Sequence, residues 1–427
     1  MTATTPLANT STMDKSVDAS AKEPTRRVEI KVGLLTGGID KPYAFGLAMA
    51  LISKGVYLDF IGSDEMDSPE FHTSPNLRFL NLRGDQRRDA TLATRIWRIL
   101  IYYARLIRYT SVAKPKIFHI LWNNKFQIFD RTLLMLYYKL QGKKLVFTAH
   151  NVNAGKRDLN DSLFNRLTLR AQYQLADHIF VHTERMKSEL LEDFSVSSQA
   201  VSVIPFGINN AVPRTDLTSE QARRRLGISE GEKTILFFGR IAPYKGLHFL
   251  VTAFQRIVAR NPGYRLIIAG QPKKGSEKYL DEVLRTISYD VSLGRVIQKI
   301  QYIPDEETEV YFKSANVLVI PYTQVFQSGV LFLGYSFGLP AIATEVGSFS
   351  EDIINGRTGL LCKARDAVDL AKTIETYFES DLFKTLNSRR QEIRDYANVR
   401  NSWDVVGRMT LNVYAELLAS PLSQGRV

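Results

Sequence analysis

The sequence predicts an α/β protein made of two doubly wound, parallel-sheet domains that face each other. Short apolar segments that suit strands alternate with longer amphipathic segments that suit helices, and this alternation runs through both halves of the chain. Several apolar segments, such as Ile235–Phe238, are continuous, which is typical of strands buried on both faces of a parallel sheet. The chain has 427 residues, more than one hydrophobic core usually serves, so two domains are expected.

The first half opens with a predicted strand at Arg27–Thr36, a loop that begins at Gly37 and Gly38, and a helix at Tyr43–Lys54. Strand, glycine loop and helix in this order start a Rossmann-like sheet. The loop lacks the G-x-G-x-x-G pattern, so a dinucleotide is not indicated. Further strands are expected at 57–62, 77–82, 117–122, 144–148, 177–183 and 201–205, and helices at 163–175 and 185–191.

The second half repeats the pattern after a polar segment that runs to about Thr218, which is the expected linker. The domains are therefore expected to cover residues 27–212 and 213–402. Strands are expected at 235–238, 265–269, 296–302, 317–321 and 341–344, and helices at 247–261, 277–287, 305–313 and 330–337.

Two cations follow the strand at 235–238. Gly239 ends the strand, Arg240 stands at its C-terminal end, and Lys245 lies five residues further, before Gly246 and a helix. Ligands of open α/β sheets bind at the carboxyl ends of strands. A guanidinium fork and a mobile ammonium together suit a diphosphate. A surface turn with two solvated bases is the alternative.

Two further strand ends carry candidate ligand groups. Ser328 and Gly329 stand directly before the helix at 330–337, where free backbone N–H groups favour an anion; an ordinary helix cap is the alternative. His150 follows the strand at 144–148, and a substrate contact and a structural role are both open for it. His119 lies within a strand and is expected to be structural.

Composition limits the function classes. The net charge of +12 predicts attraction to anions, but no nucleic-acid-binding motif is present, so no nucleic-acid partner is expected. Cys362 is the only cysteine, which excludes an intrachain disulfide and a cysteine metal cluster. Residues 1–26 resemble a disordered tail without a signal-peptide core, and no apolar run has membrane-spanning length. A cytoplasmic location is expected.

The segment 87–116 is rich in arginine, with isoleucine, leucine, tryptophan and tyrosine between the basic residues and Asp89 as its only acid. A basic amphipathic helix of this kind suits an anionic membrane surface. A helix packed on the core with a solvated basic face fits the pattern equally well. On the first interpretation the protein lies peripherally at the inner face of the membrane.

Several segments resemble a GT-B-fold glycosyltransferase, close to glycosyltransferase family 4. They are FFGRIAPYKG (237–246), YIPDEE (302–307), ANVLVIPY (315–322) and GLPAIATEVG (338–347), with support from VIPFGIN (203–209), NGRTGLL (355–361) and SWDVVGRMTLNVY (402–414). The resemblance covers nearly all of the chain after the tail and is stronger in the second half. It implies the GT-B fold, with an N-terminal acceptor domain, a C-terminal donor domain and a last helix, about 403–418, that crosses back, so that 403–427 completes the first domain.

The resemblance also implies an enzyme that transfers a sugar from a nucleotide-diphosphate donor without a metal or a cofactor. Arg240 and Lys245 then neutralise the leaving diphosphate, and His150 lies near the donor sugar. Besides Arg240 and Lys245, the predicted donor-binding residues are Gly37, Gly38, Gly239, Tyr302, Ile303, Gln327, Ser328, Gly329, Val330 and Glu351.

One departure from the family pattern concerns two glutamates, eight residues apart, that usually precede the G-L-P turn. Val325 and Leu333 occupy these positions, and Gln327-Ser328-Gly329 replaces a glycine-rich loop. We expect a subfamily in which Ser328 and backbone amides hold phosphate and Glu351 takes part of the lost role. The predicted function is sugar transfer to a saccharide or lipid-linked acceptor in polysaccharide assembly; a non-catalytic, nucleotide-sugar-binding partner subunit is the alternative.

Overall fold

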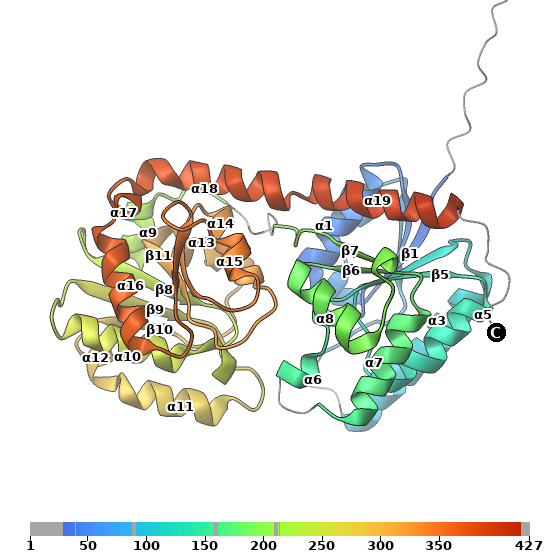
Figure 1. Cartoon of the computed structure of the whole chain (residues 1–427), viewed down its shortest axis with the longest axis horizontal. Coiled ribbons are helices and arrows are strands. Elements are labelled where there is room, and N and C mark those ends of the chain that lie inside the picture. Colours follow the sequence, from blue (N-terminus) through green and yellow to red (C-terminus); the bar gives the residue numbers. More distant parts are fainter. Residues whose placement is uncertain are drawn as a thin grey trace, which may run out of the picture.

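The computed structural model describes residues 29–38, 40–87, 91–157, 161–208, 212 and 214–419, and it has two α/β domains side by side (Figure 1). The predicted tail, residues 1–26, lies outside the described residues. A seven-stranded sheet has the order β3-β2-β1-β4-β5-β6-β7, and a six-stranded sheet has the order β10-β9-β8-β11-β12-β13. All the strand pairings within these sheets are parallel, which confirms the predicted fold class.

The strands of the first sheet are β1 (Lys31–Leu35), β2 (Tyr57–Gly62), β3 (Leu77–Asn81), β4 (Ile117–Ile120), β5 (Lys144–Thr148), β6 (His178–Val181) and β7 (Val201–Val203). Those of the second are β8 (Lys233–Phe238), β9 (Tyr264–Ala269), β10 (Val296–Lys299), β11 (Val317–Ile320), β12 (Ala341–Thr344) and β13 (Gly359–Cys362). Strand β10 ends three residues earlier than expected, at the edge of the sheet where only β9 pairs with it. Strand β13 was not predicted.

The helices of the first half are α1 (Lys41–Ile52), η1 (Asp64–Met66), α2 (Pro69–Thr73), α3 (Leu92–Val112), α4 (Gln127–Phe129), the π-helical turn η2 (Asp130–Leu134), α5 (Met135–Leu140), α6 (Ala154–Arg157), α7 (Leu163–Leu175), α8 (Glu184–Phe194) and η3 (Ser198–Ala200). Those of the second half are α9 (Ser219–Arg225), η4 (Pro243–Lys245), α10 (Leu247–Val258), α11 (Glu277–Thr286), α12 (Ser288–Ser292), α13 (Asp305–Ser314), α14 (Gly329–Ser336), α15 (Phe349–Asp352), α16 (Ala367–Glu379), α17 (Asp381–Lys384), α18 (Leu386–Asn401) and α19 (Trp403–Ala419).

Each sheet lies between two apolar layers, because its strands bury side chains on both faces. In the second sheet, alternate residues of β8 divide between the layers: Ile235 and Phe237 join one, and Leu236 joins the other. The first sheet is covered in the same way, with Leu34 on one face and Leu35 on the other. The continuous apolar runs in the sequence reflect this two-sided burial.

The last helix returns to the N-terminal domain. Helix α18 packs on the C-terminal domain, and α19 continues from it along α1 (Figure 1). The crossing is held at Trp403, whose indole Nε1 donates to the carbonyl oxygen of Ile208 at 2.9 Å. The amide of Ile208 in turn donates to the carbonyl oxygen of Asn401 at 2.9 Å. The predicted return of the last helix is confirmed.

Helix α3 occupies the middle of the basic segment 87–116. Its buried face consists of Tyr102, Tyr103, Leu106, Tyr109 and Thr110, so the helix does pack on the core. Its outer face is not only basic, because Leu92, Ile96, Trp97 and Leu100 are exposed as well. None of the described helices is long and apolar enough to cross a bilayer.

Candidate functional site

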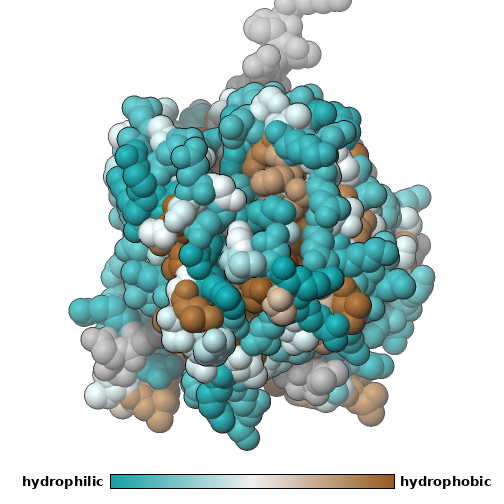
Figure 2. All heavy atoms as spheres, turned by 90° about the vertical axis from the view of Figure 1, so that its left-hand side faces the viewer, coloured by the Kyte–Doolittle hydropathy of each residue, from teal (hydrophilic) through white to brown (hydrophobic). Residues whose placement is uncertain are grey.

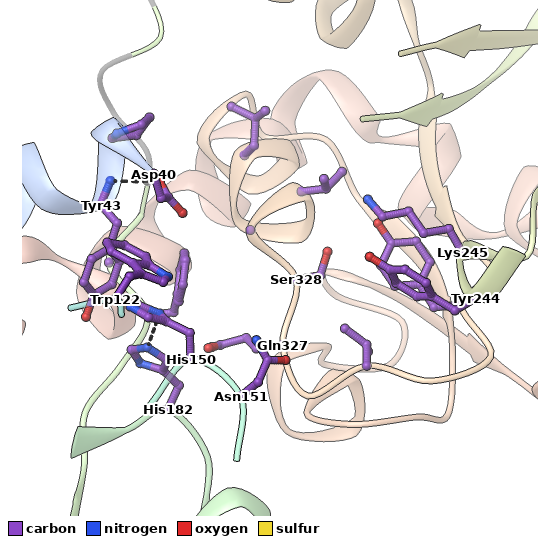
Figure 3. A pocket seen from close by; sticks show the side chains of 18 of the residues that line it. Asp40, Tyr43, Trp122, His150, Asn151, His182, Tyr244, Lys245, Gln327 and Ser328 are labelled. Carbon is purple, nitrogen blue, oxygen red and sulfur yellow. Dashed lines mark hydrogen bonds between the residues drawn. The ribbon is translucent and has the colours of Figure 1, made fainter. Parts of the chain in front are cut away.

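The domains enclose a cavity of about 430 Å³ between their facing sides (Figure 3). The N-terminal domain and the crossing segments line it with Asp40, Pro42, Tyr43, Trp122, His150, Asn151, His182, Phe206, Gly207 and Trp403. The C-terminal domain lines it with Tyr244, Lys245, Tyr322, Val325, Gln327, Ser328, Gly329, Val330 and Leu333. Most of these residues follow the carboxyl ends of strands, where open α/β sheets bind ligands.

Lys245 supplies a buried positive charge to this cleft. The residue is 9% exposed, and its Nζ lies 5.0 Å from the centre of the Tyr322 ring. No carboxylate of the described residues forms an ion pair with it. A buried ammonium without a counter-ion is costly, and such sites are tolerated where an anionic ligand supplies the missing charge.

Glycines bring the Lys245 turn close to the neighbouring strands. Gly246 has φ of +67°, and a Cβ there would lie 1.9 Å from the carbonyl oxygen of Pro321. A side chain at Gly246 would therefore force the turn that carries Lys245 away from the end of β11. A Cβ at Gly239 would lie 3.6 Å from the Lys245 Nζ and 3.2 Å from the Val330 Cγ2. The ammonium and the first turn of α14 thus both lie close to Gly239.

The N-terminus of α14 faces the same space. Ser328 is 5% exposed, and its side chain does not cap the helix. The hydroxyl and the first amides of α14 are therefore available to a ligand, and the helix dipole favours a negative one. Gln327 lines the cavity beside them, and its Oε1 is buried without a partner among the described residues. This geometry suits an anion held between Lys245 and α14.

His150 lies on the opposite wall, in the N-terminal domain (Figure 3). Its ring stacks on Trp122, with centroids 4.2 Å apart and planes 4° apart. His182 Nδ1 lies 3.2 Å from the carbonyl oxygen of Ile204, so that nitrogen carries the proton and donates. The other nitrogen of His182 then accepts from His150 Nδ1 at 3.1 Å.

Both imidazoles are neutral at neutral pH. Burial lowers the pKa of His182 to about 4, and burial together with the neighbouring His182 lowers the pKa of His150 well below its usual range. With its proton on Nδ1, His150 keeps a bare Nε2, which has no partner among the described residues. His150 is therefore a neutral residue of the cleft wall, and its Nε2, which is buried in this structure, can accept a hydrogen bond but not donate one. His119 is structural, as expected, and bonds to Tyr414 and Thr148.

The structure brings together only part of the predicted site. His150, Lys245, Gln327, Ser328, Gly329 and Val330 line the cavity, and Gly239 lies against Lys245 and Val330. The other predicted residues are not among those that line it: Arg240 and Glu351 are exposed, Tyr302 is 63% exposed, Ile303 packs in the C-terminal core, and Gly37 and Gly38 form the turn after β1. Their roles in donor binding stay predictions.

Sequence reasoning missed several residues that line the cavity: Asp40, Trp122, Asn151, His182, Tyr244, Tyr322 and Trp403. Trp122 and His182 follow β4 and β6, so the strand-end argument used for His150 could have found them. Trp403 had no such local signal, because its place depends on the return of the last helix. Val325 and Leu333, which replace the two family glutamates, do line the cavity. No cluster of three or more His, Cys, Asp or Glu residues within the described ranges could hold a metal ion.

Comparisons with known proteins agree with this architecture. Residues 218–399 match the model of "Glycosyl transferases group 1", and residues 41–212 match that of "Glycosyltransferase Family 4". The D-inositol 3-phosphate glycosyltransferase of Corynebacterium efficiens is 27% identical over 66% of this chain and 68% of its own length. The corresponding enzyme of Acidothermus cellulolyticus is 26% identical over 57% of this chain and 54% of its own length. The chain thus spans roughly half to two thirds of these relatives.

Solved structures show the same fold. Sucrose-phosphate synthase from Thermosynechococcus elongatus superposes with a TM-score of 0.72 and 19% identity, covering 92% of this chain and 100% of its own. Anabaena HepE in complex with UDP and glucose superposes with a TM-score of 0.70 and 15% identity, covering 91% of this chain and 100% of its own. With two family models that together account for both domains and a GT-B fold throughout, the chain belongs to the GT-B glycosyltransferases of the family 4 type.

Proposed function

We propose that the protein transfers a sugar from a nucleoside-diphosphate donor to a saccharide or lipid-linked acceptor during polysaccharide assembly. The observation that carries this proposal is the buried ammonium of Lys245, which has no ion-pair partner among the described residues, beside the N-terminus of α14. Sugar transfer breaks the bond between the anomeric carbon and the diphosphate, which leaves negative charge on the diphosphate. A fixed cation and a helix N-terminus are well suited to stabilise that charge.

The donor is proposed to bind with its diphosphate between Lys245 and Ser328, and its sugar toward His150. The complexes of Anabaena HepE with UDP and with UDP-glucose support uridine donors as the first to test. The bare Nε2 of His150 would accept a hydrogen bond from a sugar hydroxyl. Arg240 is exposed at the end of β8, and we propose that it turns toward the diphosphate when the donor binds.

An anionic membrane surface is the proposed partner of α3. The helix exposes Leu92, Ile96, Trp97 and Leu100, and it presents exposed arginines at 95, 105 and 108. Aliphatic and aromatic side chains beside arginines suit the boundary between headgroups and acyl chains. Docking there would bring the cleft to a lipid-linked acceptor at the inner face of the membrane.

A second candidate is a partner subunit that binds the nucleotide-sugar without turnover. Val325 and Leu333 favour it, because both line the cleft at positions where the family usually carries glutamate. An apolar side chain at these positions can hold neither a ribose hydroxyl nor developing positive charge on the sugar. Turnover separates the two candidates.

The test is a screen of uridine, guanosine and adenosine diphosphate sugars, in which binding is followed by calorimetry and cleavage by the release of free nucleotide. We expect one donor to bind and to be cleaved when acceptor is supplied. K245A and R240A should each lower turnover by about 100-fold or more, since each removes a charged contact to the leaving group.

The matched control is K278A, which removes an exposed lysine on α11. It should leave turnover unchanged. Binding without turnover would select the partner subunit, and no binding of any nucleotide-sugar would overturn both candidates.

A further inference from the structure

A second groove lies on the N-terminal domain between α4 with η2 on one side and α7 on the other. Its volume is about 630 Å³, and its lining is mainly apolar. The residues that line it are Lys125, Phe126, Gln127, Ile128, Phe129, Arg131, Thr132, Leu133, Ser162, Phe164, Asn165 and Thr168. No step of the proposed sugar transfer uses this groove.

Four large apolar side chains of the groove are exposed to solvent. The exposed fractions are 47% for Phe126, 51% for Ile128, 61% for Leu133 and 58% for Phe164. Single exposed apolar residues are ordinary, but several that converge on one groove mark a binding surface for an apolar ligand.

Arg131 places a positive charge within this apolar lining. It is half-buried, and its guanidinium donates to the side-chain oxygens of Asn165 at 2.8 Å and Gln127 at 2.9 Å. Among the described residues, its buried Nε has no partner and no carboxylate forms an ion pair with it. The neighbouring Asp130 turns instead to Tyr103 and Asn124.

The charge of Arg131 is therefore held in position by neutral oxygens, and no described carboxylate pairs with it directly. Burial lowers the pKa of Arg131, yet arginine stays protonated at any physiological pH. A guanidinium whose partners are neutral oxygens keeps its charge, which attracts a phosphate, and its terminal nitrogens have at least one further N–H group with which to bind one.

Two loops of the chain run from the cleft to the groove, so the two cavities are neighbours. In the loop after β4, Trp122 lines the cleft and Lys125 lines the groove. In the loop after β5, Asn151 lines the cleft, and Asn153 accepts a hydrogen bond at 3.0 Å from Asn165 of the groove. A ligand could therefore place one end in the cleft and the other in the groove.

From this arrangement we infer that the groove binds the lipid-phosphate end of the acceptor, with the phosphate at Arg131 and the hydrocarbon chain over Phe126, Ile128, Leu133 and Phe164. This inference rests on the proposed function and narrows its acceptor to a saccharide carried on a lipid phosphate. A free saccharide would use neither the apolar lining nor the half-buried guanidinium.

The probe for this site is dodecyl phosphate below its micellar concentration, titrated into the full-length protein by calorimetry. Two controls each carry one feature of this probe. Inorganic phosphate has the phosphate without the alkyl chain, and dodecyl maltoside has the alkyl chain without the phosphate. We expect dodecyl phosphate to bind at least about 10-fold more tightly than either control. It should bind equally well with and without saturating UDP, because the groove and the donor cleft are separate cavities.

Two pairs of variants locate the binding. F164S removes an apolar wall of the groove, and its control L163S removes the neighbouring side chain, which is 80% exposed outside the groove lining. R131Q removes the charge, and R131K keeps the charge without the fork. We expect F164S and R131Q each to weaken dodecyl phosphate about 10-fold, R131K to weaken it less, and L163S to leave it unchanged.

The inference is overturned if dodecyl phosphate competes with UDP, or if it binds F164S and R131Q as tightly as the unaltered protein. It is also overturned if dodecyl maltoside binds as tightly, since the phosphate would then contribute nothing. Failure of the proposed function has a different signature: dodecyl phosphate would bind at the groove, while no nucleotide-sugar would bind at the cleft.

Discussion

At the scale of single residues, the site contains polar and charged groups whose burial costs free energy in the absence of a ligand. Lys245 is the main example, with its ammonium over the Tyr322 ring and no acid among the described residues to balance it. The contact with the aromatic ring offsets only part of the desolvation cost. On the proposed function, the remainder is recovered when the donor diphosphate binds.

We expect K245M to stabilise the ligand-free protein while it abolishes the response to UDP. Methionine fills a similar volume without a charge, so the free energy of unfolding should rise by about 1 kcal/mol. Thermal unfolding with and without UDP measures both effects, because a ligand that binds only the folded state raises the melting temperature. A K245M protein that is less stable than the unaltered one, or that is still stabilised by UDP, would contradict this account.

His182 links the cleft wall to the pH dependence of stability. Burial lowers its pKa to about 4, so the folded state keeps it neutral while the unfolded chain takes up a proton below the ordinary histidine pKa of about 6.5. A depressed histidine pKa makes the protein less stable as pH falls. For this group alone, the loss from about pH 7 to about pH 5 is about 2 kcal/mol.

H182Q should remove this share of the pH dependence. The glutamine can still donate to the carbonyl of Ile204 and accept from His150, so the fold should be kept. Urea unfolding at the two pH values gives the loss for each protein, and we expect a difference of about 2 kcal/mol between them. Equal losses in the two proteins would show that His182 titrates normally in the folded state.

At the scale of elements, the packing of α19 on α1 fixes how the two domains meet. Trp403 fits between two glycines: a Cβ at Gly46 would lie 2.1 Å from its Cε2, and a Cβ at Gly207 would lie 2.4 Å from its Cζ2. The same indole lines the cleft. A displacement of α19 is therefore also a change in the shape of the site.

G46A should destabilise the protein by about 2 kcal/mol, because the added methyl group overlaps the indole and forces the helices apart. Chemical unfolding measures the loss, and UDP affinity should fall with it as the wall of the cleft shifts. G263A is the control, since a Cβ there meets only the side-chain oxygen of Asn261, at 3.2 Å. If G46A and G263A behave alike, Trp403 does not set the helix spacing.

At the scale of the whole molecule, charge and exposed apolar surface gather in one part of the chain. Residues 91–175 contain fifteen Lys and Arg against three Asp and Glu. The net charge of this segment therefore equals the net charge of +12 for the whole chain. Of the twenty exposed large hydrophobic side chains among the described residues, fourteen lie between Leu92 and Leu167. The outer end of the C-terminal domain, by contrast, is mostly hydrophilic, with small separate hydrophobic groups (Figure 2).

This segregation predicts membrane binding through the N-terminal domain. Replacing Arg95, Arg105 and Arg108 by Glu should strongly reduce sedimentation with vesicles that contain anionic phospholipid, and little binding to neutral vesicles is expected. Arg98 is left unchanged because it pairs with Asp85 at 3.1 Å. Replacing Lys278, Lys363 and Lys372 by Glu changes the net charge equally, but on the C-terminal domain, and should not reduce binding. Equal losses in both triple variants would mean that net charge alone drives the association.

The sequence by itself determined the local structure and the residue types of the predicted anion-binding loop. Continuous apolar runs required strands buried on both faces, and the glycines at 239 and 246 marked turns where backbones pass closely. These features depend on neighbours along the chain, so their signals are local. Not every local signal was used, since the helices between 367 and 401 and the short strand β13 were not predicted.

Only the tertiary structure decided which of these groups meet. It placed His150 and Trp122 across from Lys245, brought Trp403 into the wall from the far end of the chain, and left Arg240, Tyr302 and Glu351 outside the lining of the cavity. It also formed the groove around Arg131. Side-chain direction at a domain interface depends on how two rigid sheets are oriented, and that orientation is set by contacts between residues hundreds of positions apart, such as Gly46 and Trp403, which no local pattern encodes.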